Sequence, residues 1–384
     1  MRTWAEIDLD ALRHNYKVIK SKTECQKIMA IIKADAYGHG AVPIAQVLSE
    51  EGVYAFGVAT ADEAIELRCA GFEQPILILG VIFPEDYHRI IENNITCTIA
   101  DTETALELSL EACKTGKTAH IHIKLDTGMG RIGFLCGTDD DKTSEEIKTI
   151  YNMPGIQIDG IFSHMARADE KDKSFALCQL DKFQKMCKIL STKGVDVGLK
   201  HIANSASILE LPETHLDMVR TGIITYGLNP SGEVTDKELK NVMTLKTKVT
   251  HIKRLQKASP LSYGGKYVAQ EGKKIATIAI GYADGFSRIL SDKAHVLING
   301  KKVPVRGNIC MDQCMIDVTE TENIKIGDEV IIFGSDGNNT ISVDSVALLL
   351  GTINYEVVCS VTRRVPRAYI QDGKIAFTLN HLVQ

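Results

Sequence analysis

The chain has 384 residues, of which 44% are hydrophobic and 24% are charged, the ordinary balance of a large globular protein. Its net charge of -5 and its lack of long basic runs argue against a nucleic-acid partner and favour a small-molecule substrate. No uninterrupted apolar run approaches the roughly 20 residues that cross a bilayer, and the first residues lack the apolar core of a secretory signal. We therefore expect a cytoplasmic protein without a membrane partner.

The 10 cysteines are scattered along the chain instead of forming the framework of a small disulfide-rich domain, so we expect reduced thiols. Cys310 and Cys314 would share one face of a strand, as would His120 and His122. Neither pair has a second pair at zinc-finger spacing. We expect no metal site.

From residue 27 onward, stretches rich in β-forming residues alternate with helical patterns, as in repeated βα units. The predicted strands are residues 28–33, 54–59, 75–80, 95–100, 119–126, 156–164, 199–204 and 217–220. Helices are predicted between them, among them residues 61–68, ended by Gly71, and a helix that begins with residues 102–108 and ends near Gly116. About eight units predict a closed (β/α)8 barrel of the TIM type at residues 9–230.

After about residue 230 the pattern changes to β-type runs separated by Gly, Asn and Asp turns. These runs are residues 243–249, 275–280, 296–298 and 329–333. They predict a mostly β domain at residues 231–384. Residues 3–9 also alternate, so a strand at residues 1–8 is expected to pair with that domain. The expected fold class is thus α/β plus β.

Lys33 ends a strand that is apolar on both faces, and such strands are normally buried in a parallel sheet. Barrel enzymes carry their chemistry at the carboxyl ends of the strands, so Lys33 is the first candidate for a reactive residue. The structural alternative is a lysine whose stem packs along the strand while its ammonium reaches solvent. The predicted strand ends also carry Asp126, His164, Ser205 and Arg220.

Residues 128–133 have the spacing G-x-G-x-x-G after a strand, which is the nominal dinucleotide-binding fingerprint. Residues 135–141 should break the helix whose amino end would bind a pyrophosphate, and the segment follows about the fifth strand instead of the first. We do not expect a nicotinamide-dependent enzyme.

Residues 32–40 closely resemble the cofactor-lysine signature of the alanine racemases, which use pyridoxal 5'-phosphate (PLP). The resemblance recurs in order along most of the chain. It extends over residues 124–133, 163–166, 203–206, 218–222, 261–264, 281–286, 310–313 and 352–356. One such match would be weak evidence, but this ordered series is specific.

The resemblance implies a cofactor site in the barrel. Lys33 would form a Schiff base with PLP. The phosphate would be held by the side chains of Tyr37, Ser205 and Tyr355 and by the backbone of Gly222 and Ile223. For Ser205 the structural alternative is a helix cap. Arg220 would face the pyridine nitrogen and, because arginine keeps its proton, would leave that nitrogen unprotonated. His164 would join a hydrogen-bond network beside Arg220, although a structural role is its alternative.

Racemisation needs one acid-base group on each face of Cα, and the resemblance assigns Lys33 and Tyr263. Arg131 and the Met311 backbone N–H would bind the substrate carboxylate, and Tyr282 would narrow the substrate entrance. In this family Tyr263, Tyr282 and Met311 come from the partner subunit, which implies a homodimer with shared active sites.

Two further positions bear on the resemblance. Lys124 occupies a position that some family members carbamylate. Many relatives have arginine where this chain has Asn308. A charge of the entrance corridor is therefore missing, while the catalytic set is intact.

The resemblance implies interconversion of L- and D-alanine, which supplies D-alanine for peptidoglycan. A serine racemase or a racemase of several small amino acids is an alternative, but Tyr355 favours alanine because serine racemases tend to replace it. A non-catalytic PLP-binding protein on the same barrel is an alternative of another class. Such proteins lack the β domain that carries Tyr263. PLP decarboxylases with a similar barrel are a further alternative, which an assay for carbon dioxide separates.

Overall fold

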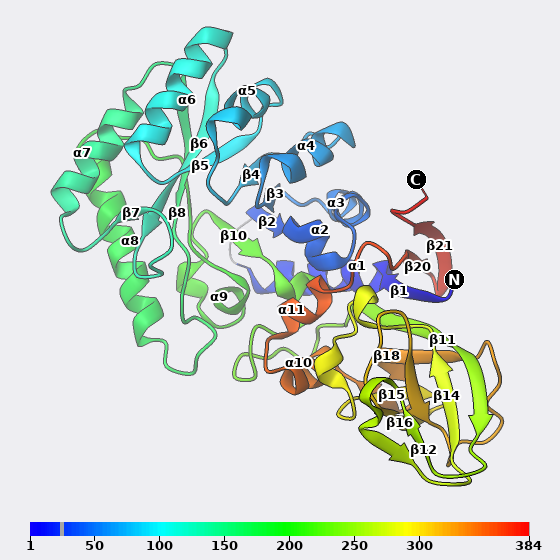
Figure 1. The fold of residues 1–384 in the computed structure, drawn as a ribbon. Helices are drawn as coiled ribbons and strands as arrows, with labels where there is room; N and C mark the ends of the chain where they lie inside the picture. The colour runs from blue at the N-terminus through cyan, green and yellow to red at the C-terminus, as the bar shows by residue number, and fades with distance from the viewer. Residues whose placement is uncertain (24–26, 384) are drawn as a thin grey trace. The chain divides into compact units, whose positions relative to one another are not determined.

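The computed structural model describes residues 1–23 and 27–383, and the chain divides into two compact units (Figure 1). One unit comprises Arg13–Ala36 and Ala41–Leu239, and the other comprises Met1–Leu12, Tyr37–Gly40 and Lys240–Gln384. No helix within the described ranges is long and apolar enough to cross a membrane.

In the described part of the first unit, eight parallel strands follow one another in the order β10-β2-β3-β4-β5-β6-β8-β9. They are β2 (Lys27–Ile31), β3 (Ala55–Val58), β4 (Ile76–Ile78), β5 (Thr96–Ile99), β6 (Ala119–Asp126), β8 (Ile156–Phe162), β9 (Leu199–His201) and β10 (Met218–Thr221). Backbone bonds from Asp217 N to Lys200 O (3.1 Å) and from Arg220 N to Ala203 O (3.3 Å) link the last strands. The strands therefore form a nearly closed barrel, which confirms the predicted α/β fold.

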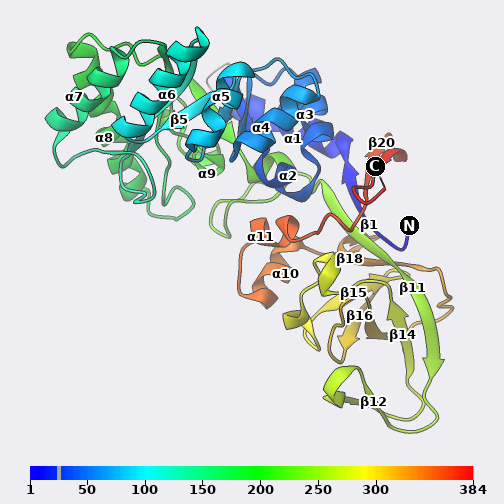
Figure 2. The same ribbon diagram turned by 45° about the horizontal axis from the view of Figure 1, so that its top comes forward.

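Helices cover the outside of these strands in both views (Figures 1 and 2). Their bounds are α1 (Leu9–Lys22), α3 (Ala41–Glu50), α4 (Ala61–Cys69), α5 (Pro84–Glu92), α6 (Thr102–Thr115), α7 (Asp140–Tyr151), α8 (Ser174–Thr192) and α9 (Ser205–Glu210). The predicted helix at residues 61–68 is α4, which begins after Thr60, whose side chain accepts from Glu63 N. The helix predicted from residue 102 to near Gly116 is α6.

The segment with dinucleotide-like spacing does not open a helix. Residues 128–133 lie in turns and bends, and they are followed by the short strand β7 (Phe134–Leu135), which pairs with β6. Helix α7 begins only at Asp140, after the N-cap Asp139. The acidic end of residues 135–141 therefore starts a helix, which the sequence analysis did not expect, but this helix lies well beyond the glycines.

The second unit is mostly β, as predicted. In the part that the structure describes, its largest sheet has the order β19-β18-β15-β16-β17-β14-β11-β1-β20-β21. These strands are β1 (Thr3–Asp8), β11 (Met243–Arg254), β14 (Lys274–Ile278), β15 (His295–Ile298), β16 (Lys301–Arg306), β17 (Cys314–Asp317), β18 (Glu329–Asp336), β19 (Asn339–Ile341), β20 (Arg367–Gln371) and β21 (Lys374–Leu379). Because β18 also pairs with β11, the strands from β11 to β18 form a closed ring. The amino-terminal strand β1 pairs with β11 and β20, as expected.

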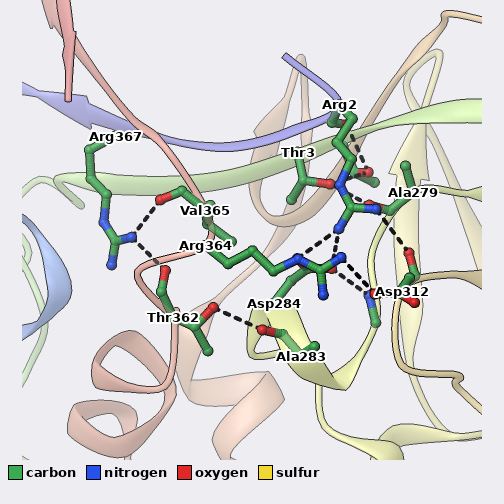
Figure 3. Close-up of polar contacts among 12 residues, drawn as sticks. Arg2, Thr3, Ala279, Ala283, Asp284, Asp312, Thr362, Arg364, Val365 and Arg367 are labelled. Carbon is green, nitrogen blue, oxygen red and sulfur yellow. Dashed lines mark hydrogen bonds and ion pairs between the residues drawn. The ribbon is translucent and has the colours of Figure 1, made fainter. Parts of the chain in front are cut away.

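The remaining elements of this unit are short. They are the hairpin strands β12 (Ser259–Leu261) and β13 (Tyr267–Ala269) and the helices α10 (Val343–Leu350) and α11 (Asn354–Cys359). Arg367 at the start of β20 is 1% exposed and donates to the carbonyl oxygens of Gly38 (3.0 Å), Val361 (2.7 Å) and Thr362 (2.7 Å). This buried guanidinium ties the loop before β20 to residues 37–40, and part of its bonding is drawn in Figure 3.

Candidate active site

The candidate residues of the barrel unit lie at the carboxyl ends of its strands. Asp126 is the last residue of β6, Arg220 lies near the end of β10, and Lys33 and His164 each follow a strand by two residues. Burial lowers the pKa of the His164 imidazole, and the cationic groups of Arg220, Arg131, Lys124 and Lys33 are close enough to lower it further. The barrel therefore brings positive charge together at this end.

Lys33 does not lie in the strand that was predicted to end with it. Strand β2 ends at Ile31, and Lys33 is the first residue of α2 (Lys33–Gly38). The next four residues have φ values of 52° to 54°, so the turn is left-handed, which L-residues adopt only at a cost of roughly 1–2 kcal/mol each. The sequence correctly indicated a turn-prone run, but its left-handed helical form was not foreseen.

The side chain of Glu63 holds the start of this turn. Its Oε1 accepts from the backbone N–H of Ala34 and its Oε2 accepts from that of Ala59, both at 2.7 Å. One carboxylate thus joins the end of β3 to the residue after Lys33. At the other end, Asp35 Oδ1 accepts from Ala41 N at 2.8 Å. These bonds offset part of the strain of the turn.

Arg220 is 3% exposed, and its guanidinium donates to carbonyl oxygens and to imidazoles. Nη2 donates to Ser163 O (2.7 Å) and Ile202 O (3.1 Å), while Nη1 donates to His201 Nδ1 (2.9 Å). Nη2 also lies 3.3 Å from His164 Nδ1. None of the ion pairs among the described residues involves this arginine. The charge is therefore stabilised by neutral acceptors and by the Phe162 ring, whose centre lies 5.4 Å from Arg220 Cζ.

The donor role of Arg220 determines the imidazole tautomers, because a guanidinium can only donate. His201 accepts at Nδ1, so its proton lies on Nε2, which is 2.8 Å from His122 Nδ1. His122 accepts there and must carry its own proton on Nε2. By the same reasoning, His164 carries its proton on Nε2. The result is an ordered chain of donors from Arg220 through His201 to His122.

Burial keeps these imidazoles neutral. It lowers the pKa of His122 to about 4, and it lowers the pKa values of His164 and His201 well below their ordinary range, with Arg220 adding to both effects. Burial, with Arg131, also lowers the pKa of Arg220 to about 9, so the guanidinium still carries its charge at neutral pH. Among these hydrogen-bonded residues, Arg220 carries the positive charge and the three histidines are neutral.

Lys124 is buried in the wall of the barrel at 2% exposure. Its Nζ donates to Leu125 O (2.6 Å) and Ile132 O (3.3 Å) and lies 5.6 Å from the centre of the Phe162 ring. Burial, followed by the positive charge of Arg220, lowers the pKa of this ammonium to about 8. A substantial fraction of Lys124 is therefore neutral at physiological pH.

Asp126 shapes the loop that carries Arg131. Its Oδ1 accepts from the backbone N–H groups of Gly128 (2.9 Å) and Gly130 (3.1 Å). Burial alone would raise the pKa of this carboxyl, but the N–H groups of the loop lower it, so Asp126 is ionised. Arg131 itself is exposed.

Ser205 and Gly222 are in direct contact, although they follow different strands. The Gly222 N–H donates to Ser205 Oγ at 3.0 Å, and both residues are buried. The helix-cap alternative for Ser205 is wrong, because Asn204 is the N-cap of α9. Ile223, which follows Gly222, is fully buried. The structure therefore brings these three predicted phosphate-binding residues close together.

In the second unit, Tyr37 and Tyr355 lie side by side with ring centres 6.0 Å apart. Tyr37 is 8% exposed, and burial, followed by the nearby Tyr355, raises the pKa of its phenol above the ordinary value. Tyr37 is therefore a protonated donor at neutral pH.

The loops that carry Tyr282 and Met311 are bonded to each other. Tyr282 N donates to Cys310 O (3.1 Å) and Ala283 N donates to Met311 O (3.0 Å). Gly281 makes this approach possible, because a Cβ there would lie 2.2 Å from Cys310 O. Tyr282 and Met311 are 40% and 52% exposed.

Asp284 anchors this pair of loops (Figure 3). Its carboxylate is 1% exposed, accepts from Gly281 N at 3.0 Å and pairs with Arg2 (2.9 Å) and Arg364 (3.4 Å). Arg364 also pairs with Asp312 at 2.6 Å, next to Met311. The two loops are therefore bonded to the amino terminus and to the segment before β20.

Glu63 and His201 contribute to this site although the sequence motifs do not include them, and His122 enters the sequence patterns only as half of a possible metal-binding pair. His201 is the last residue of β9, so the rule that singled out Lys33 and His164 could have found it. Glu63 gave no such signal, because it lies in the first turn of α4 and acts on a residue of another βα unit.

The buried histidines predict a pH-dependent stability. His122 is 5% exposed and neutral down to about pH 4, whereas the unfolded chain binds a proton near pH 6.5. Its contribution to stability is fully present above about pH 6.5 and is lost as the pH falls toward 4, by up to roughly 1.4 kcal/mol per pH unit. In urea unfolding between pH 5 and 6.5, His122→Gln should therefore show a shallower loss of free energy with acid than the unaltered chain.

His120→Gln is the matched control for this measurement. The hydrogen bond that His120 donates to Asp159 raises the pKa of the His120 imidazole. The contribution of His120 to stability therefore changes at higher pH, and the slope below pH 6.5 should be unaltered. Equal slopes for His122→Gln and the unaltered chain would contradict the prediction.

Comparisons with known proteins agree over nearly the whole chain. The family model for the alanine racemase N-terminal domain matches residues 7–230, and that for the C-terminal domain matches residues 242–369. The alanine racemase of Clostridium tetani is 47% identical over 382 residues, which are 99% of this chain and 98% of the relative. A solved alanine racemase from Clostridium difficile 630 has a TM-score of 0.94 and 42% identity, covering 100% of this chain and 99% of that one. The Bacillus anthracis alanine racemase solved with L-Ala-P has a TM-score of 0.93 and 37% identity, covering 99% and 98%. The chain therefore belongs to the alanine racemase family.

Proposed function

We propose that this chain interconverts L- and D-alanine with PLP as its cofactor. The observation that carries the proposal is the gathering of Lys33, Arg131, Lys124 and Arg220 around the neutral His164 at the strand ends of the barrel. Such a concentration of positive charge fits a cofactor that bears a phosphate and a phenolic oxygen and a substrate that bears a carboxylate. The family supplies the specific reaction, since its members are alanine racemases.

The residues of this chain suit PLP. Lys33 would supply the amine that binds the cofactor aldehyde. The buried contact between Gly222 N and Ser205 Oγ supports a phosphate site, together with the Ile223 backbone and the phenols of Tyr37 and Tyr355. Arg220 would donate to the pyridine nitrogen and leave it unprotonated. When bound, PLP would withdraw electrons from the Cα–H bond of the amino acid and so make that proton removable.

The remaining roles follow from what each side chain can donate or accept. Lys33 would exchange a proton with one face of Cα, and Tyr263 would do so with the other. His164, neutral and protonated on Nε2, is suited to donate within the site. Arg131 and the Met311 N–H would orient the substrate carboxylate, and Tyr282 would restrict the side chain to a small one. We assign these functions to a PLP-binding barrel at residues 9–230 and a β domain at residues 231–384 with the strand at 1–8.

We further infer a cytoplasmic homodimer that supplies D-alanine for peptidoglycan. Serine, or several small amino acids, would be the alternative substrate, and a coupled assay for D-amino acids with alanine and serine separates these cases. A non-catalytic PLP-binding protein would bind the cofactor but racemise neither. A decarboxylase would release carbon dioxide.

Lys33→Ala tests the central assignment. In the presence of PLP, borohydride should attach the cofactor only to a peptide that contains Lys33. The substitution should abolish this labelling and lower racemisation by roughly a thousandfold or more. The exposed Lys20 gives a matched control, since Lys20→Ala should change neither result. Labelling of a different lysine would refute the assignment.

Lys124 is suited to carbamylation, in which the neutral amine adds carbon dioxide and releases a proton. Because the pKa of Lys124 is about 8, roughly a quarter of the molecules carry a neutral amine at this position at pH 7.5. For an ordinary lysine this fraction is about a thousandth. The carbamate would exchange a cation for an anion beside Arg131 and Arg220. With ¹³C-labelled bicarbonate, NMR should detect one carbamate signal that Lys124→Gln removes and that Lys142→Gln, at an exposed site, leaves in place. No signal from the unaltered chain, or its persistence in Lys124→Gln, would rule out the modification.

The proposed dimer predicts complementation between two inactive variants. Lys33→Ala and Tyr263→Phe homodimers should each be nearly inactive, because every site carries one lesion. After subunit exchange, half of the dimers should be mixed, each with one site that carries both lesions and one that carries neither. Activity should recover to roughly a quarter of that of the unaltered enzyme. If exchange is verified with tagged chains and activity does not recover, Lys33 and Tyr263 belong to the same subunit.

A further inference from the structure

Tyr263 lies in a short turn between strands β12 and β13, where the residue is 69% exposed. The side chain therefore has little support from packing within its own chain. Within its own chain, the direction of the phenol is therefore set mainly by the backbone of residues 262–265. What holds this backbone thus decides where the phenol points.

The turn is strained at the residue before Tyr263. Ser262 has φ 61° and ψ -177°, a region that is essentially reserved for glycine. A residue with a side chain persists there only if its surroundings impose that conformation. The strain therefore points to a specific restraint on Ser262 and Tyr263.

Asn308 provides this restraint through reciprocal hydrogen bonds. Its Nδ2 donates to Tyr263 O at 2.6 Å, and its own backbone carbonyl accepts from Ser262 Oγ at 2.5 Å. The orientation of the Asn308 amide is determined by this contact, because a carbonyl oxygen can only accept. Gly307 lets the two segments approach, since a Cβ there would lie 2.9 Å from Leu261 O.

The segment that carries Asn308 is itself anchored. Gly307 N donates to Asp292 Oδ1 (2.7 Å), and Ile309 N donates to Ser291 Oγ (2.9 Å). Two residues after Asn308, Cys310 O accepts from Tyr282 N. Residues 307–310 therefore form a fixed support that touches both the Tyr263 turn and the Tyr282 loop.

We propose that Asn308 is a positioning residue for racemisation, which aligns the Tyr263 phenol by holding the Tyr263 carbonyl with its side-chain amide. This inference rests on the proposed role of Tyr263 as the second acid-base group. It assigns a function to Asn308 in this chain. The neutral side-chain amide of Asn308 donates to the backbone carbonyl of Tyr263.

Two substitutions separate the hydrogen bond from the shape of the side chain. Asn308→Asp keeps the shape but presents only oxygens to the Tyr263 carbonyl, and Asn308→Ala removes the group. Asn338→Ala is the matched control, because Asn338 is exposed in the turn between β18 and β19. All variants are studied as the full chain with PLP.

Hydrogen exchange measures the restraint without reference to activity. The peptide that spans residues 262–265 should exchange at least tenfold faster in both Asn308 variants and at an unaltered rate in Asn338→Ala. Ser262→Gly removes the strain together with the hydroxyl, so it should also loosen the turn. Combining it with Asn308→Ala should raise the exchange rate little further, because both substitutions act on the same clamp, the pair of hydrogen bonds between Asn308 and residues 262–263. Unchanged exchange in both Asn308 variants overturns the inference.

Kinetics measures the effect on the reaction. The Asn308 variants should lower kcat ten- to a hundredfold with little change in KM. With alanine deuterated at Cα, the isotope effect should rise only for the enantiomer whose proton Tyr263 removes. A merely structural defect would reduce the amount of active enzyme and leave the isotope effects unaltered, which would overturn the inference. If the unaltered chain does not racemise alanine, the proposed function fails, and the exchange measurement still tests the clamp.

Discussion

The buried guanidinium of Arg220 is the constraint on which the rest of the barrel site depends. A charge at 3% exposure is costly unless its donors are satisfied, and here carbonyl oxygens and imidazole nitrogens satisfy them. The acceptors come from the ends of β8 and β9. The guanidinium on β10 therefore bonds to these strands at the place where β9 and β10 are not paired with each other. It also makes His201 and His164 accept at Nδ1, which sets their tautomers, and its charge adds to the burial that keeps both imidazoles neutral.

This arrangement gives the site an excess of positive charge, which the ionised Asp126 offsets only in part. Lys124 is also buried. In addition to burial, the charge of Arg220 lowers the pKa of Lys124, and both charges lower the pKa of His164. A site of this kind is stabilised when an anion enters it, and both the proposed cofactor and the proposed substrate bring anionic groups. Carbamylation of Lys124 would act in the same direction by replacing a buried cation with an anion.

The two residues proposed to exchange protons share a structural principle, although they belong to different units of the chain. Lys33 opens a left-handed turn and Tyr263 follows a serine in a conformation typical of glycine. In each case a side chain from elsewhere holds the backbone: the Glu63 carboxylate bonds the N–H after Lys33, and the Asn308 amide bonds the carbonyl of Tyr263. Strain of this kind fixes the direction of a reactive group because few other conformations are open to it.

The sequence by itself determined the barrel strands to within a few residues and the strand-end location of Lys33, His164 and Arg220, and it permitted the pairing of the first strand with the β domain. Those features follow from local periodicity and from the rule that parallel strands expose their carboxyl ends together. The tertiary structure alone decided the left-handed turn after Lys33, the tautomers of the histidines, the partnership of Ser205 with Gly222 and the clamp of Asn308 on Tyr263. Each of these depends on a contact between residues that are distant in sequence, such as Ala34 with Glu63, and no local pattern records which distant group will meet a given backbone N–H or carbonyl.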